Sequence, residues 1–124
     1  MSPPSEKLAA NSKSLALRAL LGKLRPADEA ELHAQTLSAF EVNHVPFVHE
    51  VQITKQDRID FMVEDIGIEI KTRGQAREVV RQIHRYAQSQ KISSLILLTT
   101  MPSHVVIPAE MNGKEVHVVI LENW

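Results

Sequence analysis

The sequence predicts an α/β domain with a mixed central sheet flanked by helices, in the order ααβββαββ. The spacing of apolar residues changes from helical to strand-like near Val45 and returns to helical after Gly74. The stretch SSLILLTT is continuously apolar, as expected of a central strand covered on both faces. With 124 residues and 44% hydrophobic content, the chain suits one compact domain. We therefore expect one site on one fold.

The N-terminal third divides into an arm and two helices. Residues 1–13 are rich in Ser, Pro and charge and are expected to form a flexible arm, which leaves 14–124 as a single domain. Four leucines at helical spacing predict the first helix: Leu17, Leu20, Leu21 and Leu24. Pro26 marks a break before a second helix that runs to about Phe40.

Three strands are predicted next, in the segments VPFVHEVQIT, RIDFMVE and IGIEIKT. The tripeptide KQD and a turn containing Gly67 separate them, which predicts a meander. The helical period returns in QAREVVRQIHRYAQSQ, whose apolar residues form one inward stripe. After the apolar strand, a loop with Pro102, Pro108 and Gly113 leads to the last strand, KEVHVVILEN. Helices are therefore expected on both faces of the sheet.

Composition excludes several classes of protein. A formal net charge of -1 gives no overall basic field, so any anion site must be a local patch. The absence of cysteine excludes disulfides, thiolate metal sites and a cysteine nucleophile. The histidines lack the spacing of a zinc site, and no Gly-rich loop indicates a nucleotide cofactor. No long apolar run predicts a leader or a membrane span, so we expect a cytoplasmic protein.

The segment DRIDFMVEDIGIEIKTR carries charges inside an otherwise apolar hairpin. Glu69 and Lys71 are two apart and share one strand face, while Ile68 and Ile70 take the other. If the strands pair around the turn, Asp60 falls opposite Lys71 or one step away. Clustered carboxylate oxygens favour a hard divalent cation. A cross-strand salt bridge on a solvated face is the alternative interpretation.

The order of these residues resembles the PD-(D/E)XK nuclease superfamily, in particular its Holliday junction resolvase-like and RecB-like groups. Asp60 is followed after eight residues by Glu69-Ile70-Lys71, and a helix with Gln-Ile-His-Arg-Tyr comes just afterwards. The resemblance implies a restriction-endonuclease-like fold and a DNA endonuclease that uses Mg²⁺, for which Mn²⁺ can substitute. One departure is Ile59, which stands where the family often has Pro.

The resemblance also implies roles for these residues. Asp60, Glu69 and the backbone carbonyl of Ile70 would bind the metal, and Lys71 would position or help deprotonate the attacking water. Gln82 on the following helix would orient Lys71, the water or the substrate phosphate.

Members of these groups carry a further acidic residue in the helix before the sheet. Glu31 is the best candidate for this additional metal ligand. Glu29 and Glu41 in the same segment, and Glu50 on the first strand, are the alternatives.

A basic ridge next to this site is the expected DNA contact. Arg77, Arg81 and Arg85 recur every four residues, and Arg73 and Lys55 extend the charge. Tyr86, on the helix face of the glutamine four residues before it, is a further candidate for nucleic-acid binding. Most such ridges are simply solvated, which is the alternative here.

Two further expectations concern assembly and biological role. A homodimer is expected through the apolar segment VHVVILENW, unless Trp124 packs on its own domain. A small nuclease of this kind suits recombination or repair of structured DNA in a bacterial or phage-infected cell. The alternative function is a catalytically inactive nuclease fold that binds nucleic acid or a protein partner.

Overall fold

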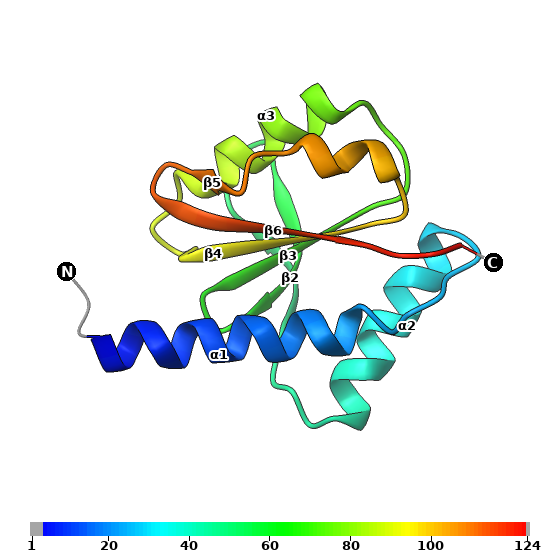
Figure 1. Ribbon diagram of the computed structural model, residues 1–124, viewed down its shortest axis with the longest axis horizontal. Helices are drawn as coiled ribbons and strands as arrows, with labels where there is room; N and C mark the ends of the chain where they lie inside the picture. Colours follow the sequence, from blue (N-terminus) through cyan, green and yellow to red (C-terminus); the bar gives the residue numbers. More distant parts are fainter. Residues whose placement is uncertain (1–3, 124) are drawn as a thin grey trace.

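The chain forms an α/β structure in three layers, with one mixed sheet between two layers of helix (Figure 1). The computed structural model describes the backbone of residues 4–123, and the side chains from Ser12 onward. Helix α3 covers one face of the sheet, and α1 and α2 cover the other. The helices have the following bounds: α1 Pro4–Leu21, α2 Glu29–Val42, α3 Ala76–Ala87, and the short 3-10 helix η1 Pro102–Val106.

The sheet contains six strands in the order β1-β2-β3-β4-β6-β5 over the part of the chain that the structure describes. Its strands have the following bounds: β1 Val48–Gln52, β2 Arg58–Val63, β3 Ile66–Lys71, β4 Ser94–Thr99, β5 Glu110–Met111 and β6 Lys114–Ile120. The first three pair antiparallel, as the predicted meander requires, whereas β3, β4 and β6 run parallel. The two-residue strand β5 pairs antiparallel with β6 and was not predicted.

Strand β4 separates two apolar cores. Ile96 and Leu98 belong to the core beneath α1 and α2, while Leu95 and Leu97 belong to the core beneath α3. This confirms the prediction of a central strand covered on both faces, and it explains why SSLILLTT lacks any polar alternation.

The flexible arm predicted over residues 1–13 is wrong for residues 4–13. Helix α1 begins at Pro4, so residues 4–13 are helical rather than irregular. The segment is rich in Ala, Leu, Lys and Glu, which have high helix propensity, and Pro suits the first turn of a helix. Residues 1–3 lie outside the described residues. None of the helices that the structure describes combines the length and apolar character needed to cross a membrane.

The hairpin between β2 and β3 turns two residues earlier than its glycine suggests. Val63 pairs with Ile66, and Glu64 takes a left-handed φ of 53° in the turn. Gly67 instead lies within β3, where a Cβ would meet the Ile59 side chain at 2.5 Å. The glycine is therefore required for close packing between strands and not for the turn.

Candidate functional site

The regular alternation of side chains in β2 breaks at Asp60. Ile59 packs in the core beneath α3, whereas Phe61, two residues later, packs in the core beneath α1 and α2. Residues two apart in a regular strand share a face, so the backbone must rotate between them. On the neighbouring strand, Glu50 lies between the pairs His49–Phe61 and Val51–Ile59 and has a left-handed φ of 55°. The two strands are thus distorted together, at the position of the Asp60 carboxylate.

This distortion brings the Asp60 and Glu69 carboxylates together between β2 and β3. The Ile70 N–H donates to Asp60 Oδ2 at 2.7 Å, and the Asp60 N–H donates to Glu69 Oε1 at 3.2 Å. The paired register of the two strands ends at Phe61 and Ile68, so side-chain oxygens continue the contact where the ladder stops. Asp60 was predicted to lie opposite Lys71 or one step away, but it lies next to Glu69, two residues before Lys71.

Glu69 is an almost fully buried carboxyl group, with 3% of its surface exposed. Burial, and secondly the nearby Asp60 charge, raise the pKa of Glu69 to about 8, although the Lys71 charge opposes the shift. A solvated surface ion pair is therefore excluded as an account of these charges. Near neutral pH the site holds a proton that an incoming cation would have to displace.

Tyr86 and Gln82 support Glu69 from α3. The Tyr86 hydroxyl lies 3.1 Å from Glu69 Oε2 and 3.2 Å from the Arg58 carbonyl oxygen, and Gln82 donates to it at 3.1 Å. A phenol has one proton, so a protonated Glu69 can donate to Tyr86 while Tyr86 donates to Arg58. Burial and the Glu69 charge raise the pKa of Tyr86. Gln82, which was predicted to orient other groups of the site, contacts the Tyr86 hydroxyl and through it holds Glu69 in place.

Tyr86 requires a correction, since it was predicted to bind nucleic acid. Its side chain is fully buried, with 0% of its surface exposed, and its hydroxyl group points to Glu69. The spacing of the glutamine and tyrosine correctly predicted a shared helix face. It could not reveal that this face packs against the sheet.

Lys71 stands at the end of β3, partly open to solvent. Its Nζ lies 3.6 Å from Glu69 Oε2, and 28% of the side chain is exposed. It lines a cleft of about 200 Å³ together with Arg73, Gln82 and Arg85. The lysine can therefore contact both the buried carboxylate and an anion that enters the cleft.

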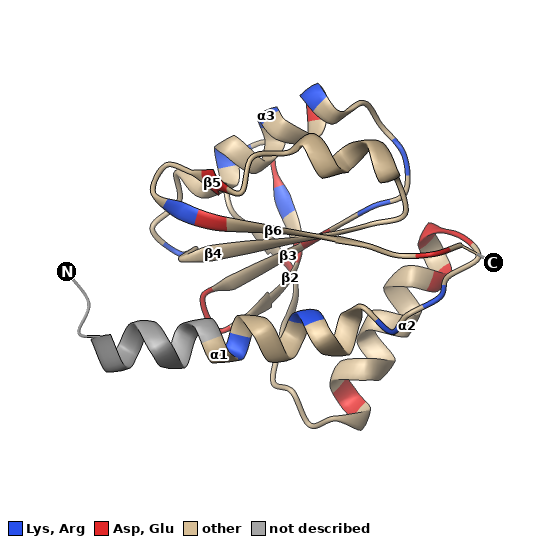
Figure 2. Cartoon of the chain, viewed as in Figure 1, with Lys and Arg blue, Asp and Glu red and all other residues tan. Residues whose placement is uncertain are grey.

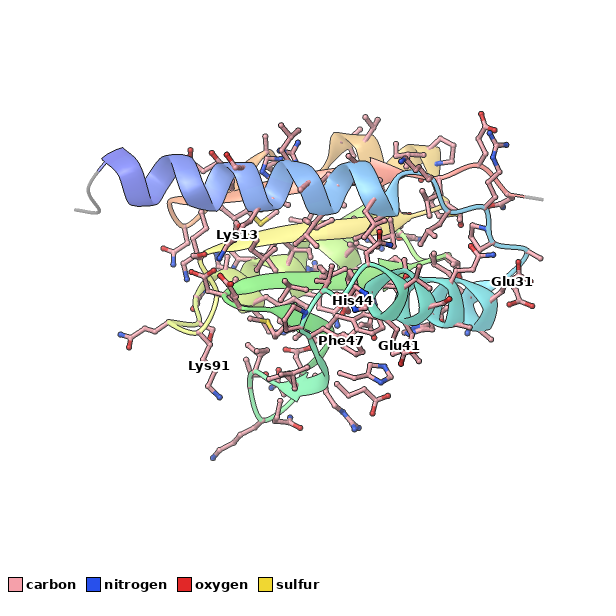
Figure 3. The ribbon with its side chains drawn as sticks, turned by 90° about the horizontal axis from the view of Figure 1, so that it is seen from below. Lys13, Glu31, Glu41, His44, Phe47 and Lys91 are labelled. Atoms are coloured by element: carbon pink, nitrogen blue, oxygen red, sulfur yellow. The ribbon has the colours of Figure 1, made fainter. Side chains whose placement is uncertain are left out.

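The acidic residues proposed for α2 and β1 have separate places. Glu31 accepts from the Ala27 N–H and the Gln35 amide at the outer end of α2, as part of the helix cap (Figure 3). Glu41 is exposed near the other end of the helix. Glu50 pairs with Arg58 at 3.3 Å. The structure therefore does not bring Glu31 to the carboxylate pair.

Two other α2 residues reach the sheet instead, one just after β3 and the other at Asp60 of β2. Glu29 Oε1 accepts from the Thr72 hydroxyl at 3.2 Å, and His33 Nε2 lies 4.0 Å from Asp60 Oδ1. Glu29 and His33 are four apart, so one helix face presents both. Glu29, one of the alternatives to Glu31, also lines a second cleft of about 460 Å³ with Thr72, Arg73 and Thr100.

One arginine of the predicted basic ridge makes an ion pair inside the protein, and the other residues of the ridge are exposed without such a role. Arg85 makes a bidentate contact to the buried Asp57, at 2.6 and 2.9 Å, and the Arg85 hydrogen bond lowers the pKa of Asp57. Arg73, Arg77 and Arg81 are exposed, as is Lys55. Figure 2 shows Lys and Arg positions, in blue, along α3 and on the segment that leads into it. Three of the four predicted arginines thus remain available to a phosphate backbone.

We expect Arg85→Ala to destabilise the fold by about 2 kcal/mol, because it leaves Asp57 buried without its cation. This figure is below the usual cost of breaking a buried pair, since 42% of the Arg85 side chain is exposed. Urea unfolding measures the change, and Arg81→Ala on the same helix is the matched control. Equal stability of the two variants would show that the ion pair contributes nothing.

Sequence reasoning missed Asp57, His33 and the contact between Tyr86 and Glu69. One feature of the sequence could have indicated Asp57. Thr54 precedes it by three residues, a spacing at which Thr and Asp often form a local hydrogen-bonded turn, as they do here. His33 had no signal beyond its spacing from Glu29. Both depend on which segments pack together, which a single sequence does not show.

The carboxylate pair meets part of the requirement for a divalent cation. Over the described residues, no group of three or more His, Cys, Asp or Glu side chains could hold a metal ion. Asp60 and Glu69 supply two carboxylates, which suits Mg²⁺ because this ion keeps several of its waters. Close approach of the two carboxylates, one of them buried, is costly without a positive charge between them.

Comparisons of the chain with protein-family models, with curated proteins and with solved structures find no match. The candidate function therefore rests on the site itself.

Proposed function

We propose that this protein is a Mg²⁺-dependent endodeoxyribonuclease with a restriction-endonuclease-like fold, similar to the PD-(D/E)XK superfamily. The observation that carries the proposal is the joint placement of Asp60, Glu69 and Lys71. Two carboxylates meet where β2 and β3 separate, and the lysine stands beside them at the mouth of a cleft. The fold contributes support of its own, since a meander is followed by α3 and then by parallel strands.

The proposed site provides each group that phosphodiester hydrolysis requires. Asp60, Glu69 and the Ile70 carbonyl would hold Mg²⁺, and the bound ion would lower the pKa of a water molecule so that it can attack phosphorus. Lys71 would orient this water and offset negative charge on the phosphate oxygens. Tyr86, held by Gln82, would keep the Glu69 carboxylate in position. Mn²⁺ would replace Mg²⁺.

A panel of labelled DNAs tests the proposal. Junctions, flaps, single strands and plain duplexes are incubated with the protein in Mg²⁺, in Mn²⁺ and in a chelator. We expect metal-dependent cleavage of at least one substrate and its loss in Asp60→Ala, with circular dichroism as the check on folding. An equally active Asp60→Ala protein would refute the mechanism. The preferred substrate would indicate whether the protein acts in recombination or in repair. The proposed location is the cytoplasm of a bacterial or phage-infected cell.

Arg77 and Arg81 are the residues with which to test the DNA path. Both are exposed on α3, and neither has the structural role that Arg85 has. Replacing both with alanine is expected to weaken DNA binding uniformly across sequences and to reduce the slope of log K against log salt by about one to two units. The double variant Lys23→Ala, Lys91→Ala removes the same charge elsewhere. An unchanged slope in the arginine variant would move the DNA path away from α3.

One observation favours the alternative of a nuclease fold that binds without cutting. Both carboxylates already accept backbone N–H groups from the opposite strand, and no third acidic ligand joins them among the residues described. Calorimetry with Mn²⁺ separates the two functions. Heat of binding in the wild type that disappears in Glu69→Ala supports the enzyme, whereas no binding to the wild type supports the binder.

A further inference from the structure

The two edges of the sheet differ in how they are protected from pairing with another chain. At one edge, β1 is short and carries the left-handed Glu50 in its middle, which bends the strand. At the other edge, β5 covers only the beginning of β6, through Glu110 and Met111. The remaining outer edge of β6 is formed by HVVI, which contains no Pro, Lys or bulge.

The backbone groups on this open edge can be assigned residue by residue. The Leu121 N–H donates to the Thr99 carbonyl of β4, so odd-numbered residues of β6 direct their backbone groups inward. The Val116 N–H, which points outward, donates to the Ala109 carbonyl. Val118 and Ile120 also point outward, and no described residue pairs with their N–H and C=O groups.

We propose that β6 pairs antiparallel with β6 of a second copy of this chain, which joins two sheets into one. A two-fold axis at Val119 places Val118 of each copy opposite Ile120 of the other. This register forms four backbone hydrogen bonds from the four open groups of each chain. The register with the axis at Val118 would pair Ile120 with Val116, which is already bonded to Ala109. Of these two registers, the hydrogen-bonding pattern favours the axis at Val119.

Exposed apolar side chains favour a second copy as the occupant. Ile120 is 40% exposed, and Val105 and Val106 on the adjoining η1 are 65% and 70% exposed. By strand alternation Ile120 lies on the same face as Val116, which is the face that α3 and η1 cover. Two-fold pairing would bring Ile120 of each copy against Val118 of the other, and such an isologous contact needs a single self-complementary surface.

The arrangement has a consequence for the site. A two-fold axis between antiparallel strands of one sheet is perpendicular to that sheet, so both α3 layers lie on the same side. The two clefts beside Lys71 would then open on one face of the dimer. The use of both clefts on one DNA depends on the proposed nuclease function, whereas the dimer itself does not.

Single cysteines test the pairing, because the wild-type chain contains none. Val119→Cys places two thiols across the axis in a non-hydrogen-bonded pair, where Cα atoms are about 4.5 Å apart and a disulfide can form. His117→Cys is the control, because four residues of offset separate its two thiols by about 13 Å. We expect mild oxidation to convert Val119→Cys to a covalent dimer at least tenfold faster than His117→Cys.

Sedimentation provides a second measurement without cysteine. The wild type is expected to be dimeric at tens of micromolar, and Ile120→Lys is expected to be monomeric with an unchanged circular dichroism spectrum. Val42→Lys, at an exposed valine of α2, should remain dimeric. A monomeric wild type, or equal cross-linking of the two cysteine variants, would overturn the proposal. Neither result depends on whether the protein cuts DNA.

Discussion

Replacing Lys71 with alanine is expected to lower the rate of the proposed Mg²⁺-dependent DNA cleavage by about 10³-fold, the typical effect of removing one positioned group from a reacting centre. Lys71 Nζ lies 3.6 Å from Glu69 and lines the cleft that a phosphate would enter. Without this cation, the attacking water of the proposed mechanism would lose its orientation and the phosphate would lose a counter-charge. Single-turnover cleavage rates at saturating protein concentration measure the effect on the chemical step.

Two comparisons separate this catalytic role from a general loss of positive charge. Lys91→Ala removes an exposed lysine from the loop after α3 and should retain the wild-type rate (Figure 3). The pH profile should change as well, because the Lys71 charge lowers the pKa of Glu69 and its removal should raise it. Cleavage by Lys71→Ala at the wild-type rate would show that another group activates the water.

The order of helices and strands was predictable because it depends on local patterns. The alternation in IGIEIKT correctly placed Glu69 and Lys71 on one face of β3 and the isoleucines on the other. The apolar run of β4 correctly indicated burial on both faces. These features follow from residues near one another in the chain, so no knowledge of tertiary packing is needed.

The detailed geometry of the site was not predictable in the same way. The break in β2 at Asp60 occurs together with the left-handed Glu50 on β1, and nothing local marks either residue. Strand pairing also decided the neighbour of Asp60, which is Glu69. Helix spacing correctly grouped Gln82 with Tyr86, but only the packing of α3 on the sheet shows that Tyr86 is buried.

Replacing Glu69 with glutamine is expected to stabilise the folded protein at alkaline pH, by on the order of 5 kcal/mol at pH 9. The folded-state pKa of Glu69 is about 8, against an ordinary value of 4.5. Protonation of this carboxyl group therefore favours the folded state. Its contribution is complete below pH 4.5, declines as the pH rises, and is lost above about pH 8.

Glutamine should preserve the hydrogen bonds of the protonated state. Its amide oxygen can accept from the Asp60 N–H, and its NH₂ group can donate to Tyr86, which then donates to the Arg58 carbonyl. The variant should consequently show little change in unfolding free energy between pH 5 and pH 9 from this position. Removal of the carboxylate should also abolish metal binding and cleavage, so stability and activity change in opposite directions.

Urea unfolding in a chelator at pH 5, 7 and 9 measures the effect without bound metal. The difference between Glu69→Gln and the wild type should be small at pH 5 and should grow steadily with pH. Glu41→Gln removes an exposed carboxylate from α2 and should follow the wild type at every pH (Figure 3). A Glu69→Gln protein that is less stable than the wild type at pH 9 would mean that Glu69 is ionised in the fold, held by Lys71 and Tyr86. The carboxylate pair would then be ready for a cation without releasing a proton.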